Sequence, residues 1–455
     1  MAKSKPIARL RCAVKNYEWG SIGEGSHVAR LAERNLGEEV DLVRPYAEFW
    51  MGTHPSGPSY VASNVAEDTV SLKDWIGENP AVLGEKVPDK WGPDLPFLFK
   101  VLSVAKALSI QAHPDKKLAE LLHKSRPDIY KDANHKPEMA VAITEFKALC
   151  GFVTAEEVKD VLATVPEVRE LIGIEENGSG LIGIKDYHSS RSNPRENGNG
   201  FASKANGNGF SIEENGNGAV VGGESKTYLK SIFTTLMSAS QDAVSNAIQK
   251  LKSCLNDENK IRSLTEKEQL ILMLEQQYPG DVGVVSAFFF NYVTLFPGEA
   301  LYIGANEPHA YIYGECIECM ATSDNVVRAG LTPKFRDVPA LCSMLTYKQG
   351  FPEILRGVPL NKNVYRYTPP FEEFEVDRCS LLPDETVTFS PVPGPSIFLV
   401  LSGAASIKID SLNGLESFSE GDVFFLSAHT EANITNAAAA MLVLFRAGVN
   451  ERFFD

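Results

Sequence analysis

The change between strand-like and helix-like periodicity along the chain is the feature that most restricts its fold. Residues 1–153 contain short apolar runs between glycine, proline and polar turns, such as Leu98-Phe99-Lys100-Val101-Leu102, a pattern typical of a β-sandwich. The pattern changes at Thr154-Ala155-Glu156-Glu157, a capping box that is followed by apolar residues at helical spacing. Strand character returns near Val284. The sequence therefore predicts a mainly β chain with a helical insert.

The same changes of pattern predict how the chain divides into domains. One barrel is made of two separate parts, the insert lies between them, and a second barrel follows. The predicted segments are residues 1–153 (first part of the first barrel), 154–282 (helical insert), 283–335 (second part of the first barrel) and 336–455 (second barrel).

A weak internal repeat supports two related barrels. Pro297-Gly298-Glu299 and Glu420-Gly421-Asp422 both lead into strand-like apolar runs. His309 follows the first of these turns, whereas Ala432 stands at the equivalent distance after the second. The second barrel is therefore predicted to be metal-free and structural.

A low-complexity stretch lies inside the insert at about residues 173–225, where Asn-Gly pairs recur. Such a glycine-, asparagine-, serine- and glutamate-rich composition cannot bury enough apolar surface to offset its ordering entropy. It is predicted to be a disordered surface loop without a catalytic role.

Charge and composition exclude several classes of partner. A net charge of −15 argues against general nucleic-acid binding and against docking on anionic lipid. No apolar run approaches the ~20 residues that a membrane span requires, and the first residues lack the apolar core of an export signal. The expected location is the cytoplasm, where most of the seven cysteines would stay reduced. Cys316 and Cys319 stand on a predicted strand and would point to opposite faces, so they are predicted to be packing residues.

Two pairs of residues have the spacing that brings side chains to one face of a strand. Gln111 and His113 are two apart, and so are Lys136 and Glu138. If both strands line one barrel, these side chains converge, and His309 on a returning strand adds a fourth ligand. Imidazole, carboxylate and amide oxygen suit one zinc ion, with room for water or substrate. Spacing alone leaves open that Gln-x-His is a hydrogen-bonded pair at a strand end.

The remaining histidines receive no ligand role from the sequence. His135 would point away from Lys136 and Glu138 on a strand, so a supporting or structural role is expected. The histidines without any predicted role are His27, His54, His123, His188 and His429.

Two long segments resemble the signatures of a known family. Residues 130–138, Tyr-Lys-Asp-Ala-Asn-His-Lys-Pro-Glu, are similar to the Y-x-D-x-N-H-K-P-E signature of type I mannose-6-phosphate isomerases. Residues 309–334 match every fixed position of H-A-Y-x-x-G-x-x-x-E-x-M-A-x-S-D-N-x-x-R-A-G-x-T-P-K, the second signature of that family. The segments around Trp19, Trp50 and Gln111 also resemble it. Motifs of this length carry a small false-positive risk.

The resemblance implies both a fold and a metal site. The fold would be a cupin barrel that holds zinc, interrupted by a helical domain and followed by a second cupin barrel. The implied activity interconverts mannose 6-phosphate and fructose 6-phosphate and supplies GDP-mannose synthesis. The implied zinc ligands are Gln111, His113, Glu138 and His309, and the implied active-site arginine is Arg328. The long Gly/Asn-rich stretch is the main departure from the family pattern.

The implied reaction moves a proton between C2 and C1 of the sugar through an enediol. It needs a base within ~3 Å of that proton and a positive charge for the oxyanion that develops. Zinc and Arg328 are expected to supply the charge. Glu318 is the candidate proton carrier, with a hydroxide on the metal as the alternative base. Lys136 is expected to bind substrate or to tune the neighbouring acid.

A phosphosugar also needs groups that bind its phosphate. Cations and hydroxyls at a pocket mouth meet this need, and on the motif strands of an acidic chain the candidates are Ser109, Lys100 and Lys334. A small phosphosugar is the expected partner, and the chain is expected to be a monomer.

Three further residues are candidates to contact the sugar or to support the site. Tyr311 would share the strand face of His309. Asp324 could orient Arg328 or cap a turn. Trp19 could stack on the sugar or belong to the core.

Three other functions stay open on the sequence alone. Two histidines and a carboxylate also describe the iron site of a cupin dioxygenase, although Gln111 and the nearby cations weigh against it. A bicupin that stores or binds sugar without catalysis would lack a proton carrier, so Glu318 and Arg328 argue against it. A regulatory homologue of the isomerases is the third. Metal content and oxygen uptake would separate the first of these from an isomerase.

Overall fold

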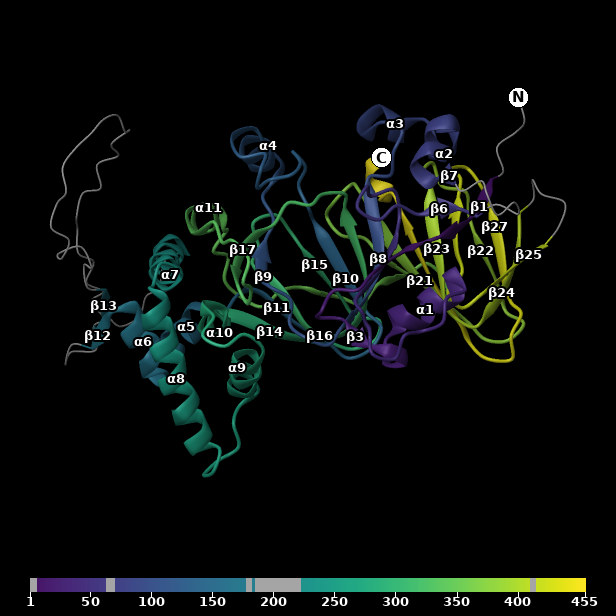
Figure 1. Cartoon of the computed structure of the whole chain (residues 1–455). Helices are drawn as coiled ribbons and strands as arrows, with labels where there is room; N and C mark the ends of the chain where they lie inside the picture. Colours follow the sequence, from purple (N-terminus) through teal and green to yellow (C-terminus); the bar gives the residue numbers. More distant parts are fainter. Residues whose placement is uncertain (1–5, 63–69, 177–181, 185–221, 410–414) are drawn as a thin grey trace. The chain divides into compact units, whose positions relative to one another are not determined.

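The chain forms a β-rich unit and a helical unit, and the predicted class, mainly β with a helical insert, is confirmed (Figure 1). The computed structural model describes residues 6–62, 70–176, 182–184, 222–409 and 415–455. Most of the predicted Gly/Asn-rich loop thus lies outside the described residues. The β-rich unit comprises Met1–Cys150, Tyr292–Val327 and Pro352–Asp455, and the helical unit comprises Gly151–Asn291 and Arg328–Phe351.

The first barrel is built around one long central strand, β16 (His309–Ala321), which pairs with β10 on one side and β8 on the other. Among the described residues the sheet has the order β18-β15-β10-β16-β8-β5-β2, and β9 and β11 pair with the first part of β16. The bounds are β2 (Ala13–Lys15), β5 (Glu48–Met51), β8 (Phe97–Val104), β9 (Ile110–Ala112), β10 (Glu138–Ala142), β11 (Phe146–Phe152), β15 (Ala300–Ile303) and β18 (Ile354–Leu355).

A glycine inside β16 lets this strand serve two sets of partners. Gly314 has φ +105°, and a Cβ at this position would collide with the carbonyl oxygen of Glu145. Glycine alone adopts this conformation at low cost. The residues before it pair with β9 and β11, and the residues after it pair with β8 and β10. One strand therefore brings both His309 and Glu318 to the barrel.

Strand β8 is buried on both faces, and its alternation separates two cores. Phe97, Phe99 and Val101 join a core shared with the second barrel, whereas Leu102 and Val104 face the interior of the first barrel. This matches the period of two in a strand. The interruption in the apolar run is Lys100, which is 6% exposed.

The second barrel packs a nine-stranded sheet against a four-stranded sheet, as counted among the described strands. Phe398, Phe424 and Ile434 belong to the core between them. The larger sheet contains β19 (Val358–Pro359), β20 (Val364–Tyr367), β21 (Glu375–Leu381), β28 (Leu442–Gly448), β23 (Ser396–Ser402), β26 (Val423–Leu426), β1 (Ile7–Arg11), β6 (Tyr60–Val61) and β7 (Val70–Ser71). The smaller contains β22 (Thr386–Phe389), β27 (Ala432–Asn436), β24 (Ala404–Lys408) and β25 (Leu415–Ser419).

The N-terminal strand departs from the predicted domain boundaries. β1 pairs antiparallel with β26, with Ile7 opposite Leu426, so it lies among the C-terminal strands rather than in the first barrel (Figure 1). Local sequence cannot specify this pairing, because a strand pattern defines faces but not partners.

The two thiols of the Cys-x-x-Cys motif belong to different cores. Cys316 lies in the interior core of the first barrel, and Cys319 lies in the core shared by the two barrels. The prediction that they point to opposite faces is confirmed. All seven cysteines of the chain fall in described segments and are free thiols.

Helices also occur in the β-rich unit. α4 (Lys116–Ser125) follows Pro114, and Asp115 caps it by accepting a hydrogen bond from the backbone N–H of Leu118. The sequence did not indicate three other helices, α1 (His27–Leu36), α2 (Leu72–Glu78) and α3 (Lys86–Trp91). The β-like segments around these short helices hid their periodicity.

Capping boxes begin two helices of the helical unit. Thr154 and Glu157 satisfy each other's backbone at the start of α5, and Thr265 and Glu268 do so at the start of α9. The helices are α5 (Ala155–Thr164), α6 (Pro166–Ile172), α7 (Gly222–Met237), α8 (Gln241–Glu258), α9 (Glu266–Gln277), α10 (Val282–Ser286) and α11 (Val338–Met344).

Two features of the helical unit differ from the predicted ones: where the Gly/Asn-rich stretch ends and which unit contains residues 328–351. α7 begins at Gly222, inside the segment expected to be a loop. Residues 328–351 belong to this unit rather than to either barrel, because α11 buries Leu341 and Met344. A helix of this length shows too few turns for its periodicity to be recognised.

Candidate metal centre

Three predicted ligands converge inside the first barrel. The Nε2 atom of His113 lies 3.4 Å from Oε1 of Glu138, and the Nε2 atom of His309 lies 3.3 Å from Oε2 of the same carboxylate. The candidate ligand atoms of the three residues all lie within 4.8 Å of one another. Each of these residues is at most 2% exposed. This geometry can hold one metal ion.

Strand pairing explains how residues so distant in sequence meet. Glu138 begins β10 and His309 begins β16, and both strands belong to the barrel sheet. Gln111 on β9 stands directly opposite His309 in an antiparallel register. Opposed residues have their side chains on the same face, about 5 Å apart. The Gln111 amide is therefore available beside the three other groups.

Hydrogen bonds fix the tautomer of both imidazoles. Nδ1 of His113 lies 2.6 Å from the carbonyl oxygen of Asn325, and Nδ1 of His309 lies 3.1 Å from that of Glu307. A carbonyl oxygen only accepts, so each Nδ1 carries the proton and donates it. Each Nε2 then keeps a lone pair that faces Glu138.

The two buried Nε2 atoms, of His113 and His309, are suited to bind a cation. Neither has a hydrogen-bond partner among the described residues. Buried polar atoms without partners are costly, and here two lone pairs also face a carboxylate. Two neutral imidazoles and a carboxylate are donors that zinc accepts. The residues present therefore fit a divalent metal of this kind.

The charge states of His113 and Glu138 agree with this fit. Burial lowers the pKa of His113 to about 4, against the opposite effect of Glu138, so the imidazole is neutral at pH 7. Burial acts to raise the pKa of Glu138, but the charge of Lys136 opposes burial, and the pKa of this carboxyl lies well below its ordinary value. The Nζ atom of Lys136 lies 2.9 Å from Oε1 of Glu138.

A second buried cluster lies on the neighbouring strands β8, β16 and β5. Lys100 stands opposite Glu318 in the register, and its Nζ lies 2.9 Å from Oε2 of Glu318 and 3.4 Å from Oε2 of Glu48. The indole N–H of Trp50 donates to Glu48 at 2.5 Å. The sequence predicts Lys100 as a phosphate-binding cation, but the structure buries it between two acids. Glu48, an acid on a strand buried on both faces, was missed.

Burial and neighbouring charges shift the pKa values of several groups in this cluster. Burial raises the pKa of Glu318, and the carboxylates of Glu138 and Glu48 raise it further against the effect of Lys100. Burial acts to lower the pKa of Lys100, but Glu318 and Glu48 outweigh it and raise that pKa. Burial, and then the charge of Glu318, raise the pKa of Tyr311 well above its ordinary value. Tyr311 follows His309 on the same strand face, as predicted.

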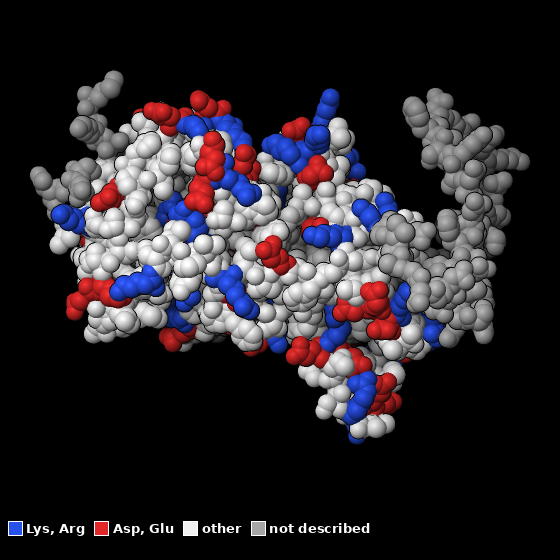
Figure 2. Space-filling model, turned by 180° about the vertical axis from the view of Figure 1, so that it is seen from behind, with Lys and Arg blue, Asp and Glu red and all other residues white. Residues whose placement is uncertain are grey.

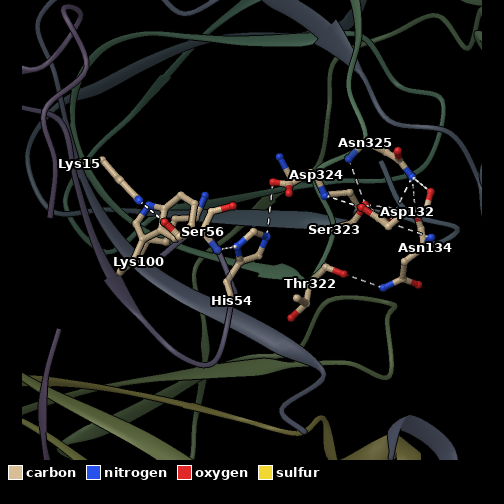
Figure 3. A network of polar contacts seen from close by, with 12 residues as sticks. Lys15, His54, Ser56, Lys100, Asp132, Asn134, Thr322, Ser323, Asp324 and Asn325 are labelled. Atoms are coloured by element: carbon tan, nitrogen blue, oxygen red, sulfur yellow. Dashed lines mark hydrogen bonds and ion pairs between the residues drawn. The ribbon is translucent and has the colours of Figure 1, made fainter. Parts of the chain in front are cut away.

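Asp324 has a partner that the sequence did not indicate. Its carboxylate lies 3.4 Å from Nε2 of His54, a residue with no predicted role (Figure 3). The backbone N–H of Ser56 donates to Nδ1 of His54, so Nε2 carries the proton. The contact with His54 lowers the pKa of Asp324, burial acts to raise it, and this pKa lies below its ordinary value. The prediction that Asp324 orients Arg328 did not anticipate this pair.

The other predicted residues lie in varied surroundings. Trp19 is half-buried, stacks on Tyr17 with ring centroids 5.8 Å apart, and packs against the interior core of the first barrel. Ser109 is half-buried immediately before β9, and Lys334 is exposed. Arg328 is half-buried on β17 (Val327–Gly330), where burial lowers its pKa. The described residues provide no ion pair for its guanidinium.

His135 connects the two barrels. Its Nε2 lies 2.7 Å from Oε1 of Glu373, which precedes β21 of the second barrel. The supporting role predicted for His135 remains a prediction, with Glu373 as the partner that the structure adds.

The fold and this centre together describe a bicupin with a candidate metal site. Family comparison matches residues 7–155 to "Phosphomannose isomerase type I, catalytic domain", residues 209–290 to the helical insertion domain of that family and residues 367–411 to its C-terminal domain. The chain belongs to the type I phosphomannose isomerase family.

Similar proteins agree over the full length. The chain is 53% identical to mannose-6-phosphate isomerase 2 of Arabidopsis thaliana, over 99% of this chain and 95% of the relative. It is 51% identical to mannose-6-phosphate isomerase 1 of the same plant, over 99% and 96%. A crystal structure of a phosphomannose isomerase variant from Salmonella typhimurium superposes with a TM-score of 0.76 at 27% identity, covering 98% of this chain and 99% of that one.

A zinc-bound structure is also similar. A mannose 6-phosphate isomerase solved with zinc has a TM-score of 0.75 at 27% identity, and the match covers 98% of this chain and 100% of that one.

No helix in the described segments is long and apolar enough to cross a membrane.

Proposed function

We propose that this chain interconverts mannose 6-phosphate and fructose 6-phosphate inside its first barrel. Full-length relatives that carry this activity in their names support the substrate. The observation that carries the site is the pair of buried imidazole Nε2 atoms without partners, which face the Glu138 carboxylate.

One zinc ion per chain would be held by four residues of this barrel. His113 and His309 offer neutral nitrogen donors, Glu138 offers a carboxylate, and Gln111 offers an amide oxygen. When bound, zinc supplies positive charge for the oxygen atom on which negative charge develops.

Glu318 is the proposed carrier of the proton. The C2–H bond breaks, the proton passes to the Glu318 carboxylate, and the electron pair forms the enediol. The carboxyl then returns this proton to C1, while a hydroxyl proton moves from O2 to O1. The raised pKa of buried Glu318 brings it closer to neutral pH, where a general base is most effective. Lys100, 2.9 Å away, holds the carboxylate in place and balances its charge.

Other cations would tune the site and bind substrate. Lys136 contacts Glu138 and keeps this carboxylate ionised. Arg328 is half-buried without an ionic partner among the described residues, which suits it to an anionic group of the substrate. Ser109 and Lys334 remain candidates for the phosphate, and Tyr311 and Trp19 for the sugar.

The test couples isomerase activity to metal content on the same sample. Zinc near one equivalent per chain, with activity lost on chelation and restored by zinc, is expected. His113→Asn should abolish zinc binding and activity, whereas His429→Asn at an exposed position of the second barrel should change neither. A folded, zinc-loaded protein without activity would contradict the proposal. Iron together with oxygen uptake would indicate a dioxygenase instead.

Three wider expectations accompany this function. The chain would act as a monomer, in the cytoplasm, and its mannose 6-phosphate would supply GDP-mannose synthesis. These stay predictions.

A further inference from the structure

Residues 322–325, the clamp loop, follow β16 and connect to the metal centre. Ser323 and Asn325 are buried, at 3% and 1% exposed, whereas the side chain of Asp324 is 46% exposed between them. The carbonyl oxygen of Asn325 accepts the Nδ1 proton of His113 at 2.6 Å. The position of the clamp loop therefore determines where the His113 ring points.

One side chain holds three successive residues of the clamp loop (Figure 3). The carboxylate of Asp132 accepts hydrogen bonds from the Ser323 hydroxyl at 2.9 Å, the Asp324 backbone N–H at 2.8 Å and the Asn325 amide at 3.3 Å. The Asn325 amide also donates to the carbonyl oxygen of Asp132 at 2.7 Å. Asp132 lies in the first family-like segment and has no role predicted from the sequence.

A second residue of the same segment holds the clamp loop from its other side. The carbonyl oxygen of Asn134 accepts from the Asn325 amide at 2.9 Å, and the Asn134 amide donates to the carbonyl oxygen of Thr322 at 2.9 Å. In both of these hydrogen bonds the acceptor is a neutral backbone carbonyl oxygen. The carboxylate of Asp132 is the charged acceptor of the network. Hydrogen bonds to a charged acceptor are about twice as strong as neutral ones.

We propose that Asp132 is a positioning residue for the metal centre, acting through the clamp loop and the Asn325 carbonyl on His113. The inference rests on the proposed function in one respect, since it requires a metal at His113, Glu138 and His309. Loss of an outer partner of a ligating histidine typically lowers metal affinity about 10- to 100-fold. Asp132 is one contact further from the metal than the Asn325 carbonyl, but it holds three residues of the clamp loop at once.

The experiment compares Asp132→Asn with Asp128→Asn in the full chain. Asp128 lies in the same connecting segment, and its side chain is 70% exposed. An amide at position 132 can accept through one oxygen only, so it leaves a donor of the clamp loop without an acceptor. Zinc affinity is measured by competition with a chelator, and the folded fraction is measured by circular dichroism on each sample.

The expected result is a zinc affinity about 10- to 100-fold lower for Asp132→Asn and unchanged for Asp128→Asn, both fully folded. Should Asp132→Asn fail to fold, Ser323→Ala removes one of the three contacts and should give a smaller loss of affinity. A folded Asp132→Asn protein with wild-type zinc affinity would overturn this inference but not the proposed function. If Ser323→Ala has to replace it, wild-type zinc affinity in Ser323→Ala would do the same. A wild-type chain that binds no zinc would overturn the proposed function as well.

Discussion

Replacing Lys100 with methionine would leave two buried carboxylates without the ammonium group that lies between them. Glu318 and Glu48 are 3% and 7% exposed, so water cannot take over the role of Lys100. Methionine retains most of the apolar stem of lysine, and the substitution therefore tests charge more than packing. The variant is expected to fold with a large loss of stability that depends on pH.

The distances set the size of this loss. At 2.9 Å and 3.4 Å, with an effective dielectric constant of about 20, the attractions of Lys100 to Glu318 and Glu48 are about 6 and about 5 kcal/mol. Desolvation of the ammonium group offsets much of this sum. Removal of one partner from a buried pair costs about 3–5 kcal/mol in practice. We expect a decrease of this size in the free energy of unfolding near pH 8.

The pH dependence follows from the raised pKa of Glu318. Without Lys100 this pKa rises further, because the cause that opposed the rise is gone. A group with a raised folded-state pKa stabilises the fold below its unfolded pKa and loses this contribution as the pH rises through the folded pKa. The stability deficit should therefore be smallest near pH 5 and should grow toward pH 8.

Urea unfolding at several pH values, followed by circular dichroism, measures this deficit. Lys117→Met, an exposed lysine on α4, is the control and should change stability little. Lys100→Met with Glu318→Gln should recover part of the loss, since the second substitution removes one unpaired charge. A deficit that is independent of pH, or that shrinks as the pH rises, would refute the reasoning.

Three further predictions concern other parts of the molecule. Removal of bound zinc by a chelator should lower the melting temperature, because free zinc at 100 times its Kd adds about 2.7 kcal/mol to the free energy of unfolding. An unchanged melting temperature would contradict a metal at His113 and His309. Arg446→Met removes one of the two arginines that pair with buried Glu375 and Asp377; its Nη1 lies 3.2 Å and 2.7 Å from them. Because Arg366 still pairs with both acids, the cost in urea unfolding should be below the about 3–5 kcal/mol of a buried charge left alone, with kcat per folded molecule unchanged. A lower kcat would contradict a purely structural second barrel. Thr265→Ala removes the cap of α9 and should cost about 1 kcal/mol in the same assay, with no loss if the capping box is unimportant.

Local patterns were sufficient for the parts of the fold that depend on neighbours in sequence. The capping box at Thr154 was readable because helix ends are specified by residues three or four apart. The seven-residue helix α11 was not readable, since few turns leave little periodicity.

The candidate ligands could be named from the sequence for two separate reasons. The spacing of Gln111 with His113, and of Lys136 with Glu138, puts each pair on one face of a strand. The long family-like segments supplied His309 and the choice among eight histidines. The sequence by itself thus determined the class of fold, the helical insert and the residue types suited to a metal.

Tertiary structure alone decided which of these residues meet. The pairing of β9, β10 and β8 around β16 brings the ligands together and sets Lys100 between Glu318 and Glu48. It also decided that β1 joins the second barrel and that Asp324 faces His54. The physical reason is that a strand's period of two specifies its faces but not its neighbours. Neighbours follow from packing among residues hundreds of positions apart, and so do the buried charges that the pairing creates.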